Sequence, residues 1–568
     1  MTRNRRTLSI LGRTLLASAM GSAVAFAQAP IVLPLSYPAL QQFKNSPEVW
    51  TQPAPSVPAA GPAVAGPWQT TNNAYPGAAT PGNPLLMTDG TVIVHQISND
   101  TSLGRNWYRL TPDINGSYVN GTWSSAGLLP AGYGPLFHAS EVLPDGRVVV
   151  NGGEYNFLSP TDTTLGAIYY PSLGAWTNVA PPATWTKIGD APSVVLNNGT
   201  YLLANCCAFN PALAATFNAT PPFTMANWTI TGTNKANGAY NEEGLTVLPN
   251  GNVLTVDVQL DAQGGSSEIY SPGTGNWSSG GATGATLTTC APGNSLSACE
   301  LGPAVLRPDS ATDGSGDNLL VFGGNNEGTA PTVIYNTNSG TWSAGPNVPS
   351  VGSVPYTLAD APAAVLPSGN MLFAASPSNW PASNSFPTPT NFLEVGPNSG
   401  GNVLTAITQN PDGPGTNSFI WNFLVLPNGQ VLAVEPQASQ NVWIYTEPAS
   451  LAGAPNASWL PVINTSPTDV TRAFTYTLNG TQFNGLSHGA AYGDDVQANT
   501  NFPIVQIVNT ASGHVFYERT SGFNTMSVAR GQSSSTNFTV SGATETGPST
   551  LFVIANGISS AGVPVTVH

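Results

Sequence analysis

Charge is scarce in this sequence, and basic charge is the scarcer sign. Only 8% of the 568 residues are charged, with 14 Lys and Arg against 29 Asp and Glu, whereas Gly and Pro contribute 60 and 51 residues. The acidic balance argues against nucleic acid and anionic membranes as partners. A chain rich in turn residues and poor in charge suits many short strands joined by turns, so we expect an all-β protein.

The N-terminal segment carries a different signal. Arg3, Arg5, Arg6 and Arg13 lie ahead of and within the apolar stretch LSILGRTLLASAMGSAVAFAQA, which ends in small residues. This pattern predicts a signal peptide over residues 1–29, not a membrane span, and Arg5 and Arg6 before TLSI also resemble a twin-arginine export signal. We therefore expect a secreted or periplasmic monomer with a formal charge of −19 after the four arginines are removed.

Cysteine is limited to four residues: Cys206, Cys207, Cys290 and Cys299. An exported chain can oxidise them, and Cys290 and Cys299 are spaced to close a small loop. Cys206 and Cys207 are adjacent, so a vicinal disulfide, crossed pairing with the other two, and free thiols all stay open.

A short phrase recurs along the chain: a strand that ends at an apolar residue, a turn that contains Gly, and a second apolar strand. The copies are LLMTDGTVIV (85–94), EVLPDGRVVV (141–150), VVLNNGTYLL (194–203), TVLPNGNVLT (246–255), AVLPSGNMLF (364–373) and LVLPNGQVLA (424–433). Their turn glycines lie 52 to 60 residues apart except for one double step, which AVLRPDSATDGSGDNLLVFGG (304–324) fills with a longer turn. Each copy predicts a β-hairpin, and there are seven.

Each hairpin is followed by a third strand, such as AIYYP (167–171) or VIYNT (333–337), and then by a Trp in a fourth. The repeated tryptophans, which we expect to pack between neighbouring units, include Trp123, Trp176, Trp277 and Trp342. Four strands in each of seven units predict a seven-bladed β-propeller over residues 81–462. Residues 30–80, rich in Pro and Ala, predict an extended lead-in. Alternating strands over 463–568 predict a β-sandwich.

The double glycines of VVVNGG (148–153) and LLVFGG (319–324), with the later Tyr and Trp, resemble those of kelch and galactose-oxidase-like propellers. The segments ANTNFPIVQI, GHVFYERT and STLFVIANGISSAGVPVTV resemble the immunoglobulin-like domain that follows the propeller in that family. The resemblance implies a kelch-type propeller followed by an immunoglobulin-like sandwich.

Acidic residues recur at one register of the repeat, six residues before the leucine of the turn. Four consecutive units place a carboxylate there: Asp190, Glu242, Glu300 and Asp360. Equivalent strand positions share a face, so these acids, with His138 near the same rim, predict a site for a hard divalent ion such as Ca²⁺, or for a cationic or polyhydroxylated ligand. The alternatives are that the acids cap strand starts and face solvent, and that His138 is a hydrogen-bonded strand-start residue.

The copper-radical oxidases of the resembling family use a Tyr-His pair before a strand like LLPDGR, a second Tyr joined to a Cys, and a His in the C-terminal domain. Here Phe137 stands before His138, Cys207 has no identifiable Tyr partner, and neither His488 nor His514 matches the ligand motif. These departures predict that copper is absent.

Several function classes remain open. No Gly-x-Ser-x-Gly segment occurs, and the adjacent Glu242 and Glu243 face opposite sides of a strand, although paired carboxylates for glycoside cleavage are not excluded. Our main hypothesis is a secreted binding or recognition protein, with carbohydrate as a candidate ligand. The alternatives are a galactose-oxidase-like oxidoreductase with a divergent metal site, and an envelope or adhesion component.

Overall fold

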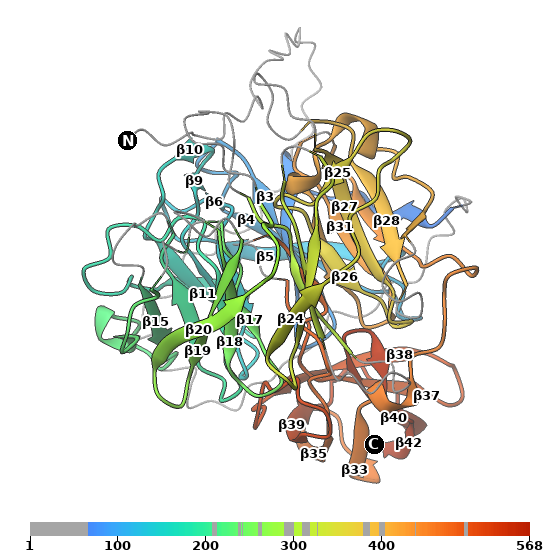
Figure 1. The fold of residues 1–568 in the computed structure, drawn as a ribbon. Helices are drawn as coiled ribbons and strands as arrows, with labels where there is room; N and C mark the ends of the chain where they lie inside the picture. Colours follow the sequence, from blue (N-terminus) through green and yellow to red (C-terminus); the bar gives the residue numbers. More distant parts are fainter. Residues whose placement is uncertain are drawn as a thin grey trace, which may run out of the picture.

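Six of the seven copies of the recurring phrase form the same hairpin turn, and the turn of the copy at 304–324 lies outside the described residues. The computed structural model describes residues 66–206, 213–236, 240, 242–258, 264–288, 300–308, 318–325, 328–378, 387–396, 404–437, 439–493 and 498–568 (Figure 1). At the turn of the second unit, Gly146 N donates to Leu143 O and Leu143 N donates to Arg147 O, both over 2.8 Å. The turn glycines have φ between +74° and +87°, which explains Gly at that position: Gly90, Gly146, Gly199, Gly251, Gly369 and Gly429.

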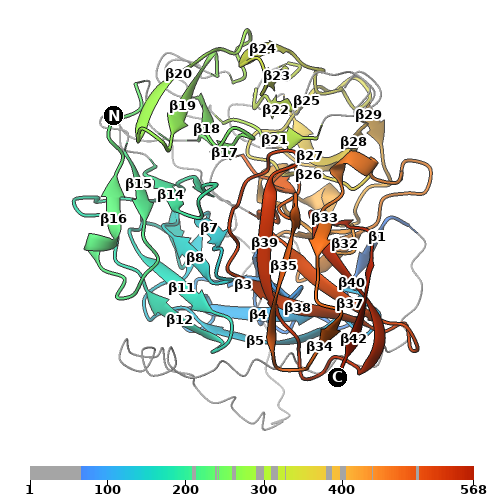
Figure 2. The same cartoon turned by 90° about the horizontal axis from the view of Figure 1, so that it is seen from below.

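The described residues form seven sheets with a core of four strands in meander order, arranged as a ring (Figure 2). We number these sheets as blades along the chain. Blades 1 to 3 are β2 (Thr80–Leu86), β3 (Val92–Ile97), β4 (Asn106–Thr111), β5 (Thr122–Leu128); β7 (Ala139–Val142), β8 (Val148–Asn151), β11 (Gly166–Tyr170), β12 (Ala175–Asn178); and β13 (Ser193–Val195), β14 (Tyr201–Ala204), β15 (Ala214–Phe217), β16 (Trp228–Ile230). Blades 4 and 5 are β17 (Thr246–Val247), β18 (Val253–Asp257), β19 (Ser266–Ser271), β20 (Asn276–Ala282); and β21 (Ala304–Arg307), β22 (Asn318–Phe322), β23 (Thr332–Asn336), β24 (Thr341–Ala344). Blades 6 and 7 are β26 (Ala363–Val365), β27 (Met371–Pro377), β28 (Asn391–Val395), β29 (Leu404–Ala406), with β25 (Tyr356–Thr357) beside β27; and β30 (Asn422–Val425), β31 (Val431–Val434), β32 (Val442–Tyr445), β1 (Trp68–Thr70).

The predicted lead-in contributes to the propeller. Strand β1 lies within the range 30–80 and pairs antiparallel with β32, so the outer strand of blade 7 comes from the beginning of the described chain. The propeller therefore begins before the boundary that we predicted at residue 81. The predicted signal peptide lies outside the described residues.

The repeated tryptophans join neighbouring blades. Trp176 on β12 donates from Nε1 to Ala126 O of blade 1 over 3.2 Å, and Trp342 on β24 donates to Gly280 O of blade 4 over 3.1 Å. Their rings also pack inside their own blades, as with Trp176 and Tyr169 at 4.9 Å between centroids. The Trp register therefore serves contacts between blades, as the repeat predicts.

The C-terminal module is built from strands that wrap a separate apolar core. Its strands are β33 (Val462–Thr465), β34 (Asp469–Val470), β35 (Thr475–Thr481), β37 (Ile504–Asn509), β38 (Val515–Ser521), β39 (Ser533–Thr539), β40 (Gly547–Ala555), β41 (Ile558–Ser559) and β42 (Val563–Val567). The core includes Leu478, Val505, Phe538 and Val553, each fully buried. Its classification as immunoglobulin-like stays a prediction.

The module covers one face of the propeller, the face formed by the hairpin turns (Figure 1). Thr520 N donates to Thr88 O over 3.1 Å, Phe523 N to Pro144 O over 3.3 Å, and Met526 N to Asn197 O over 2.9 Å. These acceptors belong to the turns of blades 1, 2 and 3. The ends of the inner strands that carry the acidic register therefore lie on the opposite face.

Three further short strands and four 3₁₀ turns lie in the connections. The strands β6 (Pro135–Leu136), β9 (Tyr155–Asn156) and β10 (Ser159–Pro160) form a small sheet in blade 2, away from the module (Figure 1). The 3₁₀ turns are η1 (Met225–Asn227), η2 (Gly413–Gly415), η3 (Ser418–Ile420) and η4 (Ala457–Trp459). No helix in the described part of the chain is both long and apolar enough to span a membrane.

Candidate metal centre

Three of the four predicted carboxylates converge. Glu242, Glu300 and Asp360 stand just before the inner strands β17, β21 and β26, and one ligand oxygen from each lies within 4.8 Å of the others. Their exposed fractions are 8%, 2% and 0%, so the alternative that they face solvent is wrong. Three successive blades therefore present buried carboxylates to a single point.

The local backbone explains how they reach this point. Glu242 and Asp360 have φ of +61° and +50°, a left-handed conformation that is uncommon for residues with a side chain. Asp360 N donates to Leu301 O over 3.0 Å, which ties blade 6 to blade 5. A Cβ on Gly324 would lie 2.0 Å from Glu300 O, so the second glycine of LLVFGG is required by the approach of the Glu300 backbone.

The opposite side of the channel mouth is apolar. At the same register, blades 2 and 7 carry Phe137 and Ile420, and both belong to one buried apolar cluster. The Phe137 ring lies 6.2 Å from those of Tyr155 and Phe419 between centroids. The carboxylates thus gather on one side of the mouth, where like charges this close require protons or a cation.

A loop of the C-terminal module enters the propeller and reaches the carboxylates. Strand β36 (Ala490–Ala491) pairs with β26 at the inner edge of blade 6, and Val365 N donates to Gly489 O over 2.8 Å. The Tyr492 hydroxyl donates to Phe419 O. A Cβ on Gly493 would lie 2.7 Å from Asp360 Cα, so this glycine is packed directly against the acidic group.

The boundary predicted at residue 463 assigned this loop, GLSHGAAYGDD, to the module, so its pairing with the propeller was not predicted. A strand of two residues leaves no periodic signal in sequence. The following residues, Asp494 and Asp495, lie outside the described residues.

Asp190, His138 and Glu243 are not members of the carboxylate group. Asp190 is buried just before β13, at 1% exposure. His138 is buried with its ring against His95, 5.8 Å away between centroids. Glu243 accepts a hydrogen bond from Lys235 Nζ over 3.0 Å. Both glutamates precede β17, so strand alternation, on which we based their opposite directions, does not apply to them.

The residues weighed for copper are dispersed. His514 lies on the module, where its Nδ1 is 2.7 Å from Glu545 Oε1, and the His488 carbonyl accepts from Thr500 N over 2.9 Å. Cys206 is buried and disulfide-bonded, while Cys207, Cys290 and Cys299 lie outside the described residues. The absence of copper stays a prediction.

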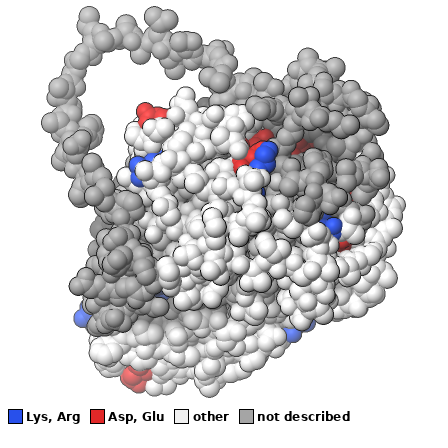
Figure 3. Space-filling view, turned by 90° about the vertical axis from the view of Figure 1, so that its left-hand side faces the viewer, with Lys and Arg blue, Asp and Glu red and all other residues white. Residues whose placement is uncertain are grey.

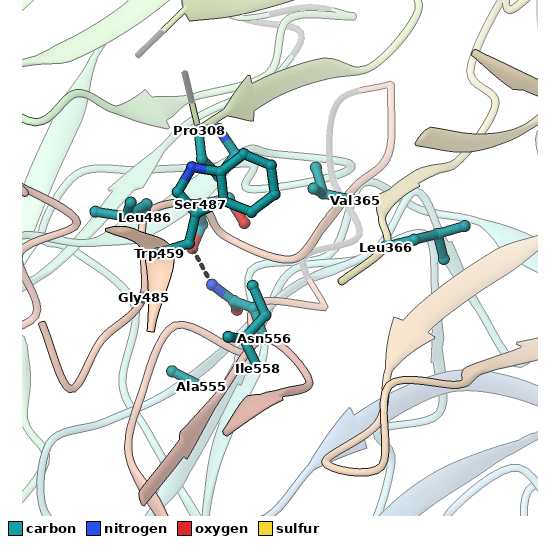
Figure 4. Close-up of a pocket in the computed structure, with 10 residues that line it drawn as sticks. All are labelled: Pro308, Val365, Leu366, Trp459, Gly485, Leu486, Ser487, Ala555, Asn556 and Ile558. Atoms are coloured by element: carbon teal, nitrogen blue, oxygen red, sulfur yellow. Dashed lines mark hydrogen bonds between the residues drawn. The ribbon is translucent and has the colours of Figure 1, made fainter. Parts of the chain in front are cut away.

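A cavity lies where the propeller meets the module (Figure 4). Val365 and Leu366 line it from blade 6, and Trp459 and Asn556 line it from the C-terminal part, where Asn556 Nδ2 donates to Ser487 O over 2.7 Å. Its volume of ≈ 10 Å³ holds about one water molecule. It is a packing defect of the interface and too small for a substrate.

The exterior matches the scarcity of charge. On the face drawn in Figure 3, the Lys and Arg side chains of the described residues are few, lie apart from one another and form no continuous track.

Comparisons with known proteins identify no family. No protein-family model matches the chain, and no curated protein matches it. Among solved structures 154 chains match. A fungal alcohol oxidase in complex with copper is 15% identical, covering 88% of this chain and 99% of its own, with a TM-score of 0.45.

Two other matching structures are a lectin and a polysaccharide lyase. The lectin SapL1, solved with alpha methyl fucoside, is 13% identical over 59% of this chain and 98% of its own, with a TM-score of 0.32. An ulvan lyase is 11% identical over 67% and 96%, with a TM-score of 0.36. At these identities and scores the likenesses carry no argument about activity.

Proposed function

We propose that this chain is an exported binding protein whose propeller holds a hard divalent cation at the channel mouth and presents it to an extracellular ligand. The proposal depends on one observation, the buried group of Glu242, Glu300 and Asp360 with ligand oxygens within 4.8 Å. Oxygens on opposite sides of a Ca²⁺ ion lie up to about 5 Å apart, because each Ca–O distance is roughly 2.3–2.6 Å. The spacing therefore suits this ion.

The coordination of such an ion leaves room for the ligand. Three carboxylates supply roughly three to six of the ~6–8 oxygens that Ca²⁺ takes. Water or the hydroxyl oxygens of a carbohydrate can fill the remaining positions, and hydroxyls are neutral donors that add no further negative charge to the buried group. A carbohydrate is accordingly the ligand class that we propose.

Calcium titration of the purified protein tests the centre. We expect binding of one Ca²⁺ per chain, measured by calorimetry, and a gain of ~2.7 kcal/mol in the free energy of unfolding when Ca²⁺ is present at about 100 times its Kd. The double substitution E242Q/E300Q removes two charged ligands and keeps the side-chain volume, so it is expected to abolish both effects.

A matched double variant controls for the loss of charge. Asp469 and Glu545 lie on the exterior of the module, and D469N/E545Q removes the same formal charge without touching the carboxylate group. This variant should bind Ca²⁺ like the wild type. Unchanged binding by E242Q/E300Q would remove the proposal, and bound copper with peroxide production from primary alcohols would replace it with the oxidase alternative.

A further inference from the structure

An open groove lies on the turn face of the propeller, between blades 2 and 3. It is lined by the turns of these two blades and by residues of blade 3 between Thr216 and Thr229. Figure 2 shows β15 and β16 at the rim of the ring, where the strands of the module do not cover them. The volume of the groove, ≈ 390 Å³, falls within the range of ~300–1,000 Å³ that small-molecule sites have. The carboxylate group lies on the opposite face, so the groove is a separate feature.

Blade 3 forms one wall of the groove with an unusually long connection. Residues 218–227 join its third strand, β15, to its outer strand, β16, and include the 3₁₀ turn η1. In three other blades a shorter segment joins the equivalent strands: 171–174 in blade 2, 272–275 in blade 4 and 337–340 in blade 5. Binding residues are often found on such connections, which a rigid scaffold holds in position.

The side chain of Asn227 fixes the shape of this connection. Its Nδ2 donates to Asn218 O over 2.8 Å and to Thr220 O over 2.6 Å. The connection is also tied to blade 2, because Ala180 N donates to Phe223 O over 3.1 Å. The wall is therefore formed before any ligand arrives, which lowers the entropic cost of binding.

The two turns beneath the groove pack directly on each other. A Cβ on Gly199 would lie 2.7 Å from Pro144 Cγ, so the turn of blade 3 touches the turn of blade 2. The module holds both turns from its side, since Phe523 N donates to Pro144 O and Met526 N donates to Asn197 O. The floor of the groove is therefore fixed from both sides.

The charge in the groove is balanced. Among its described lining residues, Asp145 and Arg147 are the charged ones. Arg147 Nη2 lies 2.5 Å from Asp145 Oδ2 and 2.6 Å from Ala219 O. Its guanidinium group also lies over the rings of Tyr170 and Phe223, 5.4 and 5.7 Å from their centroids. The arginine is thus held in place beside the carboxylate, and the pair leaves no net charge to attract an ion.

The other polar groups of the groove are neutral. In Asn198 and Asn218 the Oδ1 atom accepts the backbone N–H of the residue two positions later, over 3.0 and 3.1 Å. The Nδ2 group of each is then the one that can donate to a ligand. A carboxylate has about four acceptor positions, so Asp145, whose side chain is 49% exposed, can accept a ligand hydroxyl beside its bonds from the arginine. Such a set matches a ligand with several hydroxyl groups and no charge.

We propose that this groove binds a neutral oligosaccharide. A sugar offers hydroxyl groups to the amides and the carboxylate, and its C–H faces can pack on the half-buried Pro144 and Ala219. An anion would be repelled by Asp145, and a cation would have to compete with Arg147 for that carboxylate. The site does not depend on the cation proposed for the channel mouth.

Saturation-transfer NMR of the full chain with neutral disaccharides tests the site, and calorimetry gives the affinity of those that bind. The probes are maltose, cellobiose, xylobiose and lactose, with digalacturonic acid as the charged comparison. The measurements are made in EDTA, which removes any contribution of a bound divalent cation. We expect at least one neutral disaccharide to bind once per chain, and more tightly than the charged one.

Two variants place the ligand in the groove. D145N keeps the size of the side chain and removes a charged acceptor, so the affinity should fall by about 10- to 100-fold, the range for losing a hydrogen bond to a charged group. Thr229→Lys fills the groove from its exposed outer strand and should lower the affinity by at least about 10-fold. Ser343→Lys is the matched control, because Ser343 follows the repeated Trp at the same strand position in blade 5.

The control variant and E242Q/E300Q should bind the sugar like the wild type, and Thr229→Lys should still bind Ca²⁺. Binding that is lost in EDTA or in E242Q/E300Q would place the sugar at the channel mouth and overturn the groove assignment while supporting the proposed function. No binding of any neutral probe, tighter binding of digalacturonic acid, or unchanged affinity in Thr229→Lys would also overturn it. If D145N fails to fold, Thr229→Lys decides.

Discussion

Lys235 is a fully buried charge with carboxylate partners on several sides. It has no exposed side-chain surface, bonds to Glu243 at 3.0 Å, contacts Asp257, and lies 4.0 Å from Glu268 Oε1. Burial raises the pKa of Glu243 to about 8, although Lys235 opposes that shift. The lysine therefore compensates a buried group of carboxylates, one of which, Glu243, follows Glu242 of the candidate metal centre in the chain.

Lys235→Met is expected to destabilise the fold by ~3–5 kcal/mol, since it leaves buried carboxylates without their cation. Lys187→Met is the control, because Lys187 is 45% exposed and its pair with Asp162 is worth about 1 kcal/mol or less. Urea unfolding followed by Trp fluorescence measures both. Equal losses for the two variants would contradict this account.

The buried carboxyl group of Glu518 on β38 makes the stability of the module depend on pH. It accepts hydrogen bonds from Ser541 N and Thr544 Oγ1, both over 2.6 Å, and burial raises its pKa to about 7. The unfolded carboxyl group titrates near 4.5, so the folded state holds the extra proton between these values. The resulting stabilisation is present below pH 4.5 and is lost as the pH rises through 7.

Glu518→Gln should therefore flatten the dependence of the unfolding free energy on pH between 4.5 and 7. The wild-type contribution over this window is about 3 kcal/mol. Chemical denaturation at pH 5 and pH 8 gives the difference, with the exposed Glu545→Gln as control. The prediction fails if Glu518→Gln loses as much stability over this range as the wild type.

The position of the acids within the repeat predicted that they lie together. It did not predict the place of His138, because neighbouring residues along a strand point to opposite sides. Counting back from the turn leucine places Glu242, Glu300 and Asp360 at equivalent positions, because every unit starts its inner strand in the same way. His138 is one residue beyond the register position, occupied by Phe137, and it lies between the blades against His95. His95 follows the repeated phrase LLMTDGTVIV (85–94) on β3, and nothing in that phrase marked it as a partner of His138.

At the scale of elements, the hairpin turns were predictable because their chemistry is local. Gly251 at the turn of blade 4 has φ +85° and donates from its N–H to Leu248 O over 2.8 Å. The strands β1 and β36 were not predictable, since each is only two or three residues long and pairs with a distant segment.

Gly251→Ala is expected to cost about 1–2 kcal/mol, because a side chain in the left-handed conformation brings Cβ against the backbone. Gly415→Ala is the matched control: its φ is not left-handed, and a Cβ there would meet nothing within 4 Å. The two variants are compared by their midpoints of urea unfolding, provided that the slope of the unfolding free energy against urea concentration is unchanged. A loss for Gly415→Ala as large as that for Gly251→Ala would show that the turn conformation is not the cause.

At the scale of the whole molecule, the module is joined to the propeller both on the turn face and through the channel. The turns of blades 1 to 3 accept hydrogen bonds from the module, and β36 extends blade 6 at its inner edge. The end of this inserted loop, at Gly493, touches Asp360 of the carboxylate group. The position of the module on the propeller and the geometry of the candidate metal centre therefore depend on each other.

Gly493→Ala tests that connection. The added Cβ would lie 2.7 Å from Asp360 Cα and 3.0 Å from Leu301 O, and such backbone atoms cannot move aside as the end of a flexible side chain can. Relief requires the loop to shift, with a loss of ~1–3 kcal/mol in the free energy of unfolding. Gly542→Ala, where a Cβ would meet nothing within 4 Å, should be neutral. Because the strain falls on Asp360, Ca²⁺ binding should weaken in Gly493→Ala and stay unchanged in Gly542→Ala. Equal stability and equal Ca²⁺ affinity in the two variants would show that the inserted loop does not influence the candidate metal centre.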